Sequence, residues 1–185
     1  MKKTKKPKSV EFEFNFYLKV IKETMKSDGS FLELGPGQFS ISDHFQNVTI
    51  IDNDIRVLKR HVKKKRNVLC ADYYSLVLKP NSFDYVVALH PNIYNSGKNI
   101  EWVDFKEKEF RFKEGGLEGF VSSLLNIAKK RVFIGSKKIV DDLPMERFVD
   151  KVCIYPPPFV LYEKSEHFTP YNLKEKSFEV KKWKI

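Results

Sequence analysis

Short apolar runs recur along the first 135 residues of the chain, separated by polar and turn-forming residues. Each run is four to seven residues long, which suits a strand that is buried on both faces of a sheet. The runs are residues 31–34, 48–51, 68–71, 83–89 and 131–135. We therefore predict a strand at each of them, with helices or turns in the connections.

Residues 10–26 show two competing periodicities. Apolar side chains occupy alternate positions at the start of this segment, as they do in a strand. Helical spacing, in contrast, connects Phe14, Tyr17 or Leu18, Ile21 and Met25. The length of the segment and its Lys and Glu content favour a helix, which Asp28 and Gly29 would end.

Further helices and a β-rich C-terminal part are also predicted. A short helix begins near Phe39, a second follows a cap at Asp54 and continues to about residue 65, and a third covers residues 117–130. Residues 141–150 fit another short helix. The remaining strand candidates are residues 151–155, 159–163 and 178–183. Three prolines at 156–158 separate the first two, because proline cannot lie inside a central strand.

The alternation of strands and helices, followed by a β-rich end, favours an α/β fold with a mostly parallel sheet. The chain has 185 residues, of which 42% are hydrophobic and 14% aromatic, and this suits one domain with a substantial core. We assign that domain to residues 10–185. Residues 1–9 form a lysine-rich tail that we expect to be disordered.

A glycine-bearing turn follows the first predicted strand. The strand ends in Glu33 and Leu34, and the turn Gly35-Pro36-Gly37 leads to the predicted helix start. Glycines let the backbone approach a ligand, and the helix N-terminus faces that ligand, as in the nucleotide sites of α/β sheets. A dinucleotide fingerprint would need a third glycine at position 40, where this chain has serine, and does not need the acid at position 33.

Three acids follow three successive predicted strands: Glu33, Asp52 and Asp72. The ends of parallel strands meet at one edge of the sheet, where doubly wound folds bind their ligands. An acid after the second strand can accept both ribose hydroxyls, and an acid after the third can accept from an exocyclic amine. Each acid alone is more often structural, but three in register with a glycine turn favour a ligand site.

Four segments around these residues resemble motifs of the class I S-adenosylmethionine-dependent methyltransferases. Glu33-Leu34-Gly35-Pro36-Gly37 resembles the first motif, residues 49–53 the second, residues 70–76 the third, and residues 81–87 the entry to the fourth strand. The order and spacing hold over residues 30–90, about half of the chain. Later segments fit the same plan more loosely.

The resemblance implies a Rossmann-like, doubly wound and mostly parallel sheet of seven strands, the last of them antiparallel. It also implies S-adenosylmethionine as cofactor and S-adenosylhomocysteine as product. No metal is required, because the sulfonium already activates the methyl group. By this resemblance Asp52 binds the ribose, Asp72 binds the adenine amine, and Tyr73 packs near the ring. The implied cofactor residues are Glu33, Gly35, Pro36, Gly37, Asp52, Asn53, Asp72, Tyr73 and Leu89.

The residues after the fourth predicted strand do not identify the acceptor. Residues 89–94 lack the Asn/Asp-Pro-Pro-aromatic sequence of enzymes that methylate exocyclic amines of nucleic-acid bases. His90 is the candidate base, because an imidazole titrates near neutrality, although a strand cap or one hydrogen bond explains it as well. Asn92 and Tyr94 are candidates to orient the acceptor. We expect substrate selection in residues 91–114, a long polar and aromatic connection.

The N-terminal segment is a second place for substrate selection. Helices before the first motif cover the cofactor in many similar enzymes, and Phe14, Phe16 and Tyr17 fit that role here. Sealing a hydrophobic edge of the sheet explains these aromatic residues equally well. The acceptor itself stays open: a small molecule fits the size of the chain, and a nucleic acid fits its charge and aromatic residues.

The net charge is +10, and the N-terminal tail supplies five of these charges. A second basic cluster holds Lys59, Arg60, Lys63, Lys64, Lys65 and Arg66. We expect weak nucleic-acid contact through the tail and this cluster, although a solvated helix face explains the cluster equally well. No apolar run approaches the roughly 20 residues that span a bilayer, so we expect a cytoplasmic protein without membrane contact.

Cysteine usage and two other classes of protein complete the predictions. Cys70 and Cys153 lie in apolar segments without C-x-x-C spacing, so we expect buried thiols and no metal site. A non-catalytic relative that keeps the fold as a scaffold or nucleic-acid-binding protein is the main alternative. A nicotinamide-dependent oxidoreductase is the weaker one.

Overall fold

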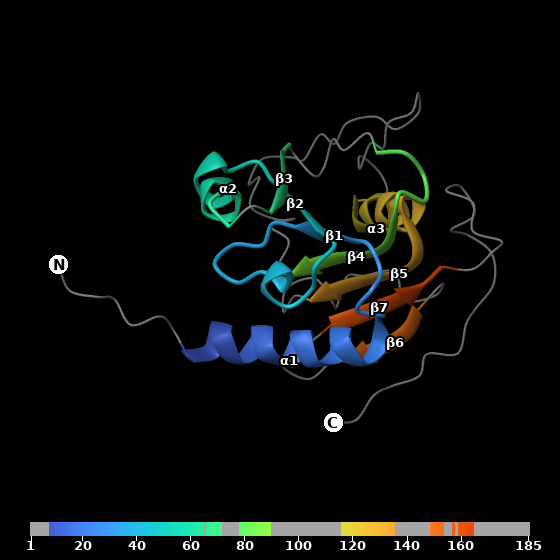
Figure 1. Cartoon of the computed structure of the whole chain (residues 1–185). Coiled ribbons are helices and arrows are strands. Elements are labelled where there is room, and N and C mark those ends of the chain that lie inside the picture. Colours follow the sequence, from blue (N-terminus) through green and yellow to red (C-terminus); the bar gives the residue numbers. More distant parts are fainter. Residues whose placement is uncertain are drawn as a thin grey trace.

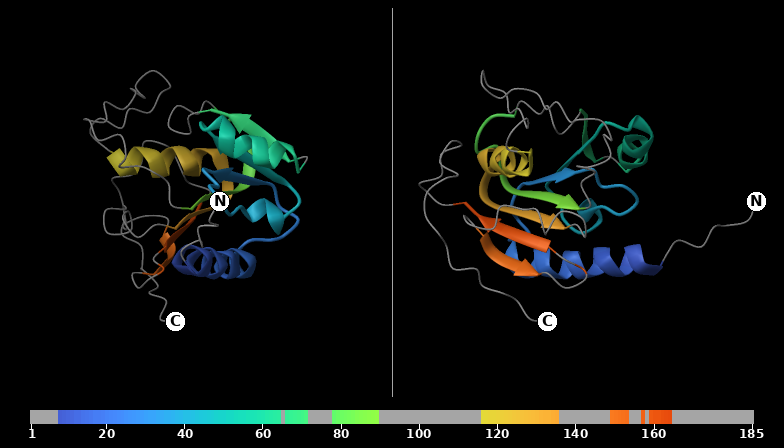
Figure 2. Two further views of the ribbon diagram at one scale, coloured as in Figure 1. Left: turned by 90° about the vertical axis from the view of Figure 1, so that its left-hand side faces the viewer. Right: turned by 180° about the vertical axis from the view of Figure 1, so that it is seen from behind.

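The computed structural model describes residues 8–64, 66–71, 78–89, 116–135, 149–153, 157 and 159–164. Within them, one sheet has helices packed on both of its faces (Figures 1 and 2). The helices are Lys8–Thr24 (α1), Ile55–Val62 (α2) and Gly116–Ile127 (α3), with a 3-10 helix at Ile41–Asp43 (η1). The strands are Phe31–Leu34 (β1), Val48–Asp52 (β2), Asn67–Cys70 (β3), Phe83–Leu89 (β4), Ala128–Gly135 (β5), Val149–Cys153 (β6) and Phe159–Glu163 (β7).

The described strands form one seven-stranded sheet in the order β3-β2-β1-β4-β5-β7-β6. The first five strands along this order pair in parallel, and β7 runs antiparallel to both β5 and β6. The predicted mostly parallel α/β sheet with an antiparallel final strand is therefore confirmed. Strands β1, β2 and β3 extend the sheet in one direction, and the strands from β4 onward extend it in the other. The strand order therefore reverses between β1 and β4, and ligands bind at this point in such sheets.

Side-chain alternation along the strands creates two apolar layers. One layer lies between the sheet and α3, and its members include Leu32, Leu34, Val86, Val132, Phe120 and Leu124. The other lies between the sheet and both α1 and α2, and its members include Tyr17, Phe31, Ile50, Leu58, Val87 and Phe133. Burying one large apolar side chain contributes about 1.5–3 kcal/mol, so these layers fix the helices to the sheet.

The periodicity of the N-terminal segment is resolved in favour of a helix. Helical spacing buries one face of α1, whereas Phe12, which only the strand pattern would bury, is 66% exposed. Tyr17 packs edge-on against Phe133, with ring centroids 5.7 Å apart. Phe16 lies 6.0 Å from the ring of Phe159, so this aromatic side chain seals the sheet and does not line the pocket described below.

Two predicted helices differ from the structure. The helix predicted near Phe39 is only the single turn η1, because Ser40 is extended (φ −136°, ψ 139°) and the chain enters β2 at Val48. The helix predicted over residues 117–130 ends at Ile127. The N–H of Ser82 donates to the carbonyl of Ile127 at 2.9 Å, which ends the helix and starts the pairing of β5 with β4.

Two smaller predictions are also corrected. Residues 149 and 150, placed in a short helix, belong to β6, which pairs with β7. Cys70 is exposed and not buried, because β3 lies at the edge of the sheet. The predicted strand at 178–183 and most of the tail lie outside the described residues. Among the described helices, none has the length and apolar character needed to cross a membrane.

Substitution of Gly29 by alanine is expected to destabilise the fold by about 1–3 kcal/mol. A Cβ there would stand 2.5 Å from Cε2 of Tyr85. That ring cannot easily move, because it is buried against Phe31 and its hydroxyl accepts a hydrogen bond from the N–H of Lys26. Urea unfolding measures the change in free energy. The matched control Ser27→Ala, at an exposed position, should stay within about 0.5 kcal/mol, and an equal loss in both variants would contradict the steric explanation.

Candidate functional site

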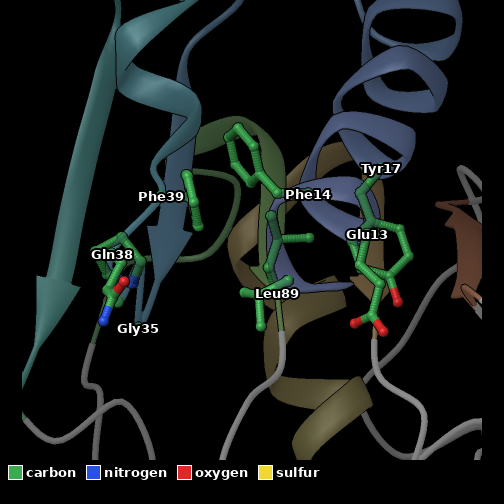
Figure 3. Close-up of a pocket in the computed structure, with 10 residues that line it drawn as sticks. Glu13, Phe14, Tyr17, Gly35, Gln38, Phe39 and Leu89 are labelled. Atoms are coloured by element: carbon green, nitrogen blue, oxygen red, sulfur yellow. The ribbon is translucent and has the colours of Figure 1, made fainter. Parts of the chain in front are cut away.

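A pocket of about 510 Å³ opens at the C-terminal ends of β1 and β4 (Figure 3). The turn after β1 forms one wall and the N-terminal half of α1 forms the other. The described lining residues are Val10, Glu13, Phe14, Tyr17, Gly35, Pro36, Gly37, Gln38, Phe39 and Leu89. The volume lies within the range of roughly 300–1,000 Å³ that is typical of small-molecule sites.

The turn has the backbone that its glycines predict. Gly35 and Gly37 have φ values of 58° and 59°, in the left-handed region that other residues adopt only with strain. The N–H of Gly35 donates to the carbonyl of Ile51 at 2.8 Å, so the start of the turn is fixed to β2. A Cβ at Gly37 would meet no atom within 4 Å, so this side of the turn faces open space that a ligand can fill.

The side chain of Glu33 holds the segment that follows the turn. Its side chain is fully buried, and its two carboxylate oxygens accept hydrogen bonds from the Ser40 hydroxyl at 2.5 Å and from the N–H of Ile41 at 2.9 Å. Burial raises the pKa of this carboxyl to about 7, although both hydrogen bonds lower it. Glu33 was predicted to bind the cofactor, but it is absent from the pocket lining, and its visible role is to hold the segment that follows the turn.

Asp52 ends β2 beside the turn. The parallel register pairs Leu34 with Ile51, so the carboxylate lies at the same edge of the sheet as the glycines. Its Oδ1 accepts the N–H of Asp54 at 2.7 Å, which fixes its orientation. Its Oδ2 accepts no hydrogen bond from the described residues. Asn53, the next predicted cofactor residue, is exposed at this edge.

The predicted helix cap after β2 is confirmed. Asp54 has an extended backbone, and its Oδ1 accepts the N–H of Arg56 at 2.8 Å, so α2 begins directly after the Asp52 carboxylate. The Arg56 guanidinium also donates to both oxygens of Asp54. These hydrogen bonds hold the pKa of Asp54 at about 2, so this cap remains charged at neutral pH.

The sequence pointed to Phe14 and Tyr17 as residues that cover the site, but sequence reasoning missed Val10 and Glu13 of the α1 wall. Its lining residues Val10, Glu13, Phe14 and Tyr17 follow the spacing i, i+3, i+4 and i+7, so they share one face of the helix. The signal was present as an acid in an otherwise apolar helical stripe. Phe14 also stacks on Phe39 of the turn, with ring centroids 5.3 Å apart, and this contact joins the two walls.

Several predicted site residues lie outside the described part of the chain. These are Asp72 and Tyr73 on the adenine side, and His90, Asn92 and Tyr94 on the acceptor side. The connection over residues 91–114 lies outside it as well, as do two of the three prolines at 156–158. Their roles stay predictions. Leu89, at the end of β4, does line the pocket.

The basic cluster is partly neutralised within the fold. Lys64 and Arg66 both form ion pairs with Asp43, which links the end of α2 to η1. Arg66 also hydrogen-bonds Nδ1 of His61 at 2.8 Å. The exposed side chains of Lys59, Arg60 and Lys63 take part in none of the ion pairs found among the described residues.

No family model and no curated protein matches this sequence. Solved structures do match. A TehB-like S-adenosylmethionine-dependent methyltransferase from Corynebacterium glutamicum aligns with a TM-score of 0.55 and 12% identity, over 85% of this chain and 98% of the other. Magnesium protoporphyrin IX methyltransferase from Synechocystis, solved with bound S-adenosylmethionine, aligns with a TM-score of 0.54 and 12% identity, over 89% and 87% of the two chains. The fold is that of S-adenosylmethionine-dependent methyltransferases.

Another match is more limited. A methyltransferase from Thermotoga maritima, described as a possible histamine N-methyltransferase, shares 20% identity at a TM-score of 0.45. The alignment covers 68% of this chain but only 52% of that protein, so this chain spans about half the length of that methyltransferase. At these identities the matches establish the fold alone.

Proposed function

We propose that this protein binds S-adenosylmethionine and transfers its methyl group to an acceptor. The observation that carries the proposal is the pairing of the Gly35–Gly37 turn with the Asp52 carboxylate at one edge of the sheet, beside a pocket of small-molecule size. A methyltransferase fold that carries the glycine turn and the Asp52 carboxylate supports S-adenosylmethionine binding more specifically than the turn or the carboxylate alone.

The residues of this edge fit the cofactor. The open side of Gly37 allows close approach of a ligand to the backbone, and the N–H groups of Gly37 and Gln38 donate to no described backbone carbonyl. Asp52 is 8% exposed and keeps one oxygen for a ligand, which suits a ribose diol. When bound, S-adenosylmethionine supplies a methyl group already activated by its sulfonium. The pocket walls then have to exclude water and orient the acceptor, and alignment alone can supply much of the rate.

Isothermal titration with S-adenosylmethionine and S-adenosylhomocysteine tests this proposal. We expect both to bind the folded protein with one site per chain, and NAD not to bind. Failure of both ligands to bind a well-folded sample at high micromolar concentration would reject the enzyme and favour a non-catalytic scaffold. Binding of NAD alone would favour the oxidoreductase. Binding without methylation of any acceptor in a broad tritium-transfer screen would leave a cofactor-binding scaffold.

We also propose that α2 contacts nucleic acid weakly. The exposed face formed by Lys59, Arg60 and Lys63 has no ion-pair partner among the described residues, so it can replace the counterions of phosphates. Conversion of all three to glutamate should reduce the logarithmic salt dependence of poly(U) binding by roughly two, because each phosphate contact on a single strand contributes about 0.7. Fluorescence anisotropy at several salt concentrations measures this slope.

A matched control separates a local contact from a general charge effect. The triple variant with glutamate at Lys22, Lys26 and Lys79 makes the same change in net charge at exposed positions outside α2. An equal reduction in both triple variants would show that net charge, and not α2, governs binding.

A further inference from the structure

The pocket beside the glycine turn has an apolar lining on both of its walls. Hydrocarbon side chains reach it from α1, from the turn and from the end of β4, and in the view of Figure 3 Leu89 lies between the two walls. The rings of Phe14 on α1 and Phe39 on the turn stack on each other, with centroids 5.3 Å apart and planes inclined by 24°. This stack joins the two walls, so the aromatic surface is part of the fold and does not need a ligand to form.

Val10 extends this apolar lining to the surface of the protein. Its side chain lines the pocket and is 41% exposed, whereas Phe14 and Leu89 are each 7% exposed. Val10 belongs to neither of the two apolar layers that fix the helices to the sheet. The packing of α1 therefore does not use this side chain, which can contact an apolar ligand that enters the pocket.

The cofactor is a poor match for this apolar lining. Asp52, at which we place the ribose, is not among the described residues that line the pocket. At its other end the cofactor carries an ammonium and a carboxylate group, and burial of these charges against hydrocarbon side chains costs solvation free energy. The apolar lining is therefore better suited to the acceptor than to the cofactor.

An apolar ring is the kind of body that this pocket favours. Its binding removes apolar surface of both ring and pocket from water, and offset or edge-on contacts with Phe14 and Phe39 add to the affinity. A polar body would lose hydrogen bonds to water and meet hydrocarbon side chains in their place. Glu13 and Gln38 also line the pocket, and a few polar groups beside an apolar surface are usual in small-molecule sites. The volume of about 510 Å³ limits the ligand to a small molecule.

We propose that the acceptor of the methyl group is a small molecule whose body is an uncharged apolar ring, and that this ring packs on Phe14 and Phe39 and contacts Val10 at the pocket entrance. This proposal rests on the proposed function, because it assigns the acceptor side of the same site. It excludes a nucleic-acid base as the acceptor, since a base is a polar ring.

The experiment uses two pocket variants, Val10→Glu and Phe14→Leu, and the matched control Phe12→Glu. Phe12 is 66% exposed on the same helix and is not among the described lining residues, so its substitution adds the same charge outside the pocket. Thermal melts first check that each protein is folded. Isothermal titration then measures the affinity of each protein for S-adenosylhomocysteine. Protein saturated with S-adenosylhomocysteine is next titrated with 2-naphthol, an uncharged apolar ring, and with cytidine, a polar one.

We expect the wild type and Phe12→Glu to bind 2-naphthol at least roughly tenfold more tightly than cytidine, because only the apolar ring loses no hydrogen bonds in the pocket. Val10→Glu should weaken 2-naphthol at least roughly fivefold, since a carboxylate at the entrance resists the loss of its water. Phe14→Leu should weaken it roughly three- to tenfold through the lost ring contact. Affinity for S-adenosylhomocysteine should change by less than about twofold in all three variants.

Every other outcome overturns the proposal or separates it from the proposed function. Binding of cytidine as tight as that of 2-naphthol, or no binding of 2-naphthol to the wild type, overturns it. An unchanged 2-naphthol affinity in either pocket variant, or an equal loss in Phe12→Glu, overturns it as well. Weaker S-adenosylhomocysteine binding in a pocket variant assigns the lining to the cofactor and also overturns it. If the wild type binds neither cofactor form, the proposed function fails, and the same 2-naphthol titrations without cofactor still test whether the pocket selects an apolar ring.

Discussion

Asp52→Asn is expected to weaken the binding of S-adenosylhomocysteine by roughly 10- to 100-fold, since a hydrogen bond to a charged group contributes about 1.5–3 kcal/mol. The substitution is conservative for the fold. An asparagine oxygen can still accept the N–H of Asp54, as Oδ1 of Asp52 does now at 2.7 Å. The other oxygen, which accepts nothing from the described residues, becomes an NH₂ donor that cannot accept from a ribose hydroxyl. Isothermal titration measures the change.

Asp54→Asn is the matched control for this variant. The same substitution two residues later affects the cap of α2, where asparagine is as good as aspartate, so cofactor affinity should change by less than about twofold. If both variants lose affinity equally, the effect comes from α2 and not from a ribose contact. If Asp52→Asn weakens only NAD, the site belongs to an oxidoreductase.

Glu33 is expected to make the free energy of unfolding fall as the pH rises from about 4.5 to 7. Burial raises the pKa of this carboxyl from 4.5 to about 7 in the folded protein. Between these values the folded state holds a proton that the unfolded state has released, so stability is fully present below pH 4.5 and is lost as the pH passes 7. The shift corresponds to about 3 kcal/mol.

The measurement is urea unfolding of the wild type and Glu33→Gln at a series of pH values. Glutamine keeps the acceptor for Ile41 and does not ionise, so the variant should lack this decline. The comparison is needed because His44 and His61 have pKa values lowered by burial, and they remove stability as the pH falls. Identical pH profiles in the two proteins would show that Glu33 does not titrate in this range.

The positions of the acids at the strand ends could be predicted from the sequence, but the hydrogen bonds that hold the segment after the turn could not. The apolar run before Asp52 determines where β2 stops, so an acid at this position must lie at the C-terminal edge of a parallel sheet. The role of Glu33 depends on the path by which Ser40 and Ile41 return over β1, and no spacing rule contains that path. The sequence therefore identified the acid but not its hydrogen bonds to Ser40 and Ile41, and a contact of Glu33 with the cofactor stays a prediction.

The α1 wall shows a similar limit. The stripe that contains Glu13 is visible as a periodicity, but the strand order decides which part of it meets the sheet and which part borders a cavity. Tyr17 packs on Phe133 in the core, and Val10 and Glu13 line the pocket. The acceptor residues predicted after Leu89 lie beyond the described residues.

The close packing of Tyr17 against Gly135 divides α1 into parts with different freedom to change during evolution. A Cβ at Gly135 would stand 3.0 Å from the Tyr17 ring, so this tyrosine and this glycine constrain each other. Val10 is 41% exposed and Glu13 is half-buried, and neither belongs to the apolar core layer of this helix. Substitutions at these two positions can therefore change the pocket wall at little cost in folding, whereas substitutions of Tyr17 or Gly135 disturb the packing of the helix on the sheet.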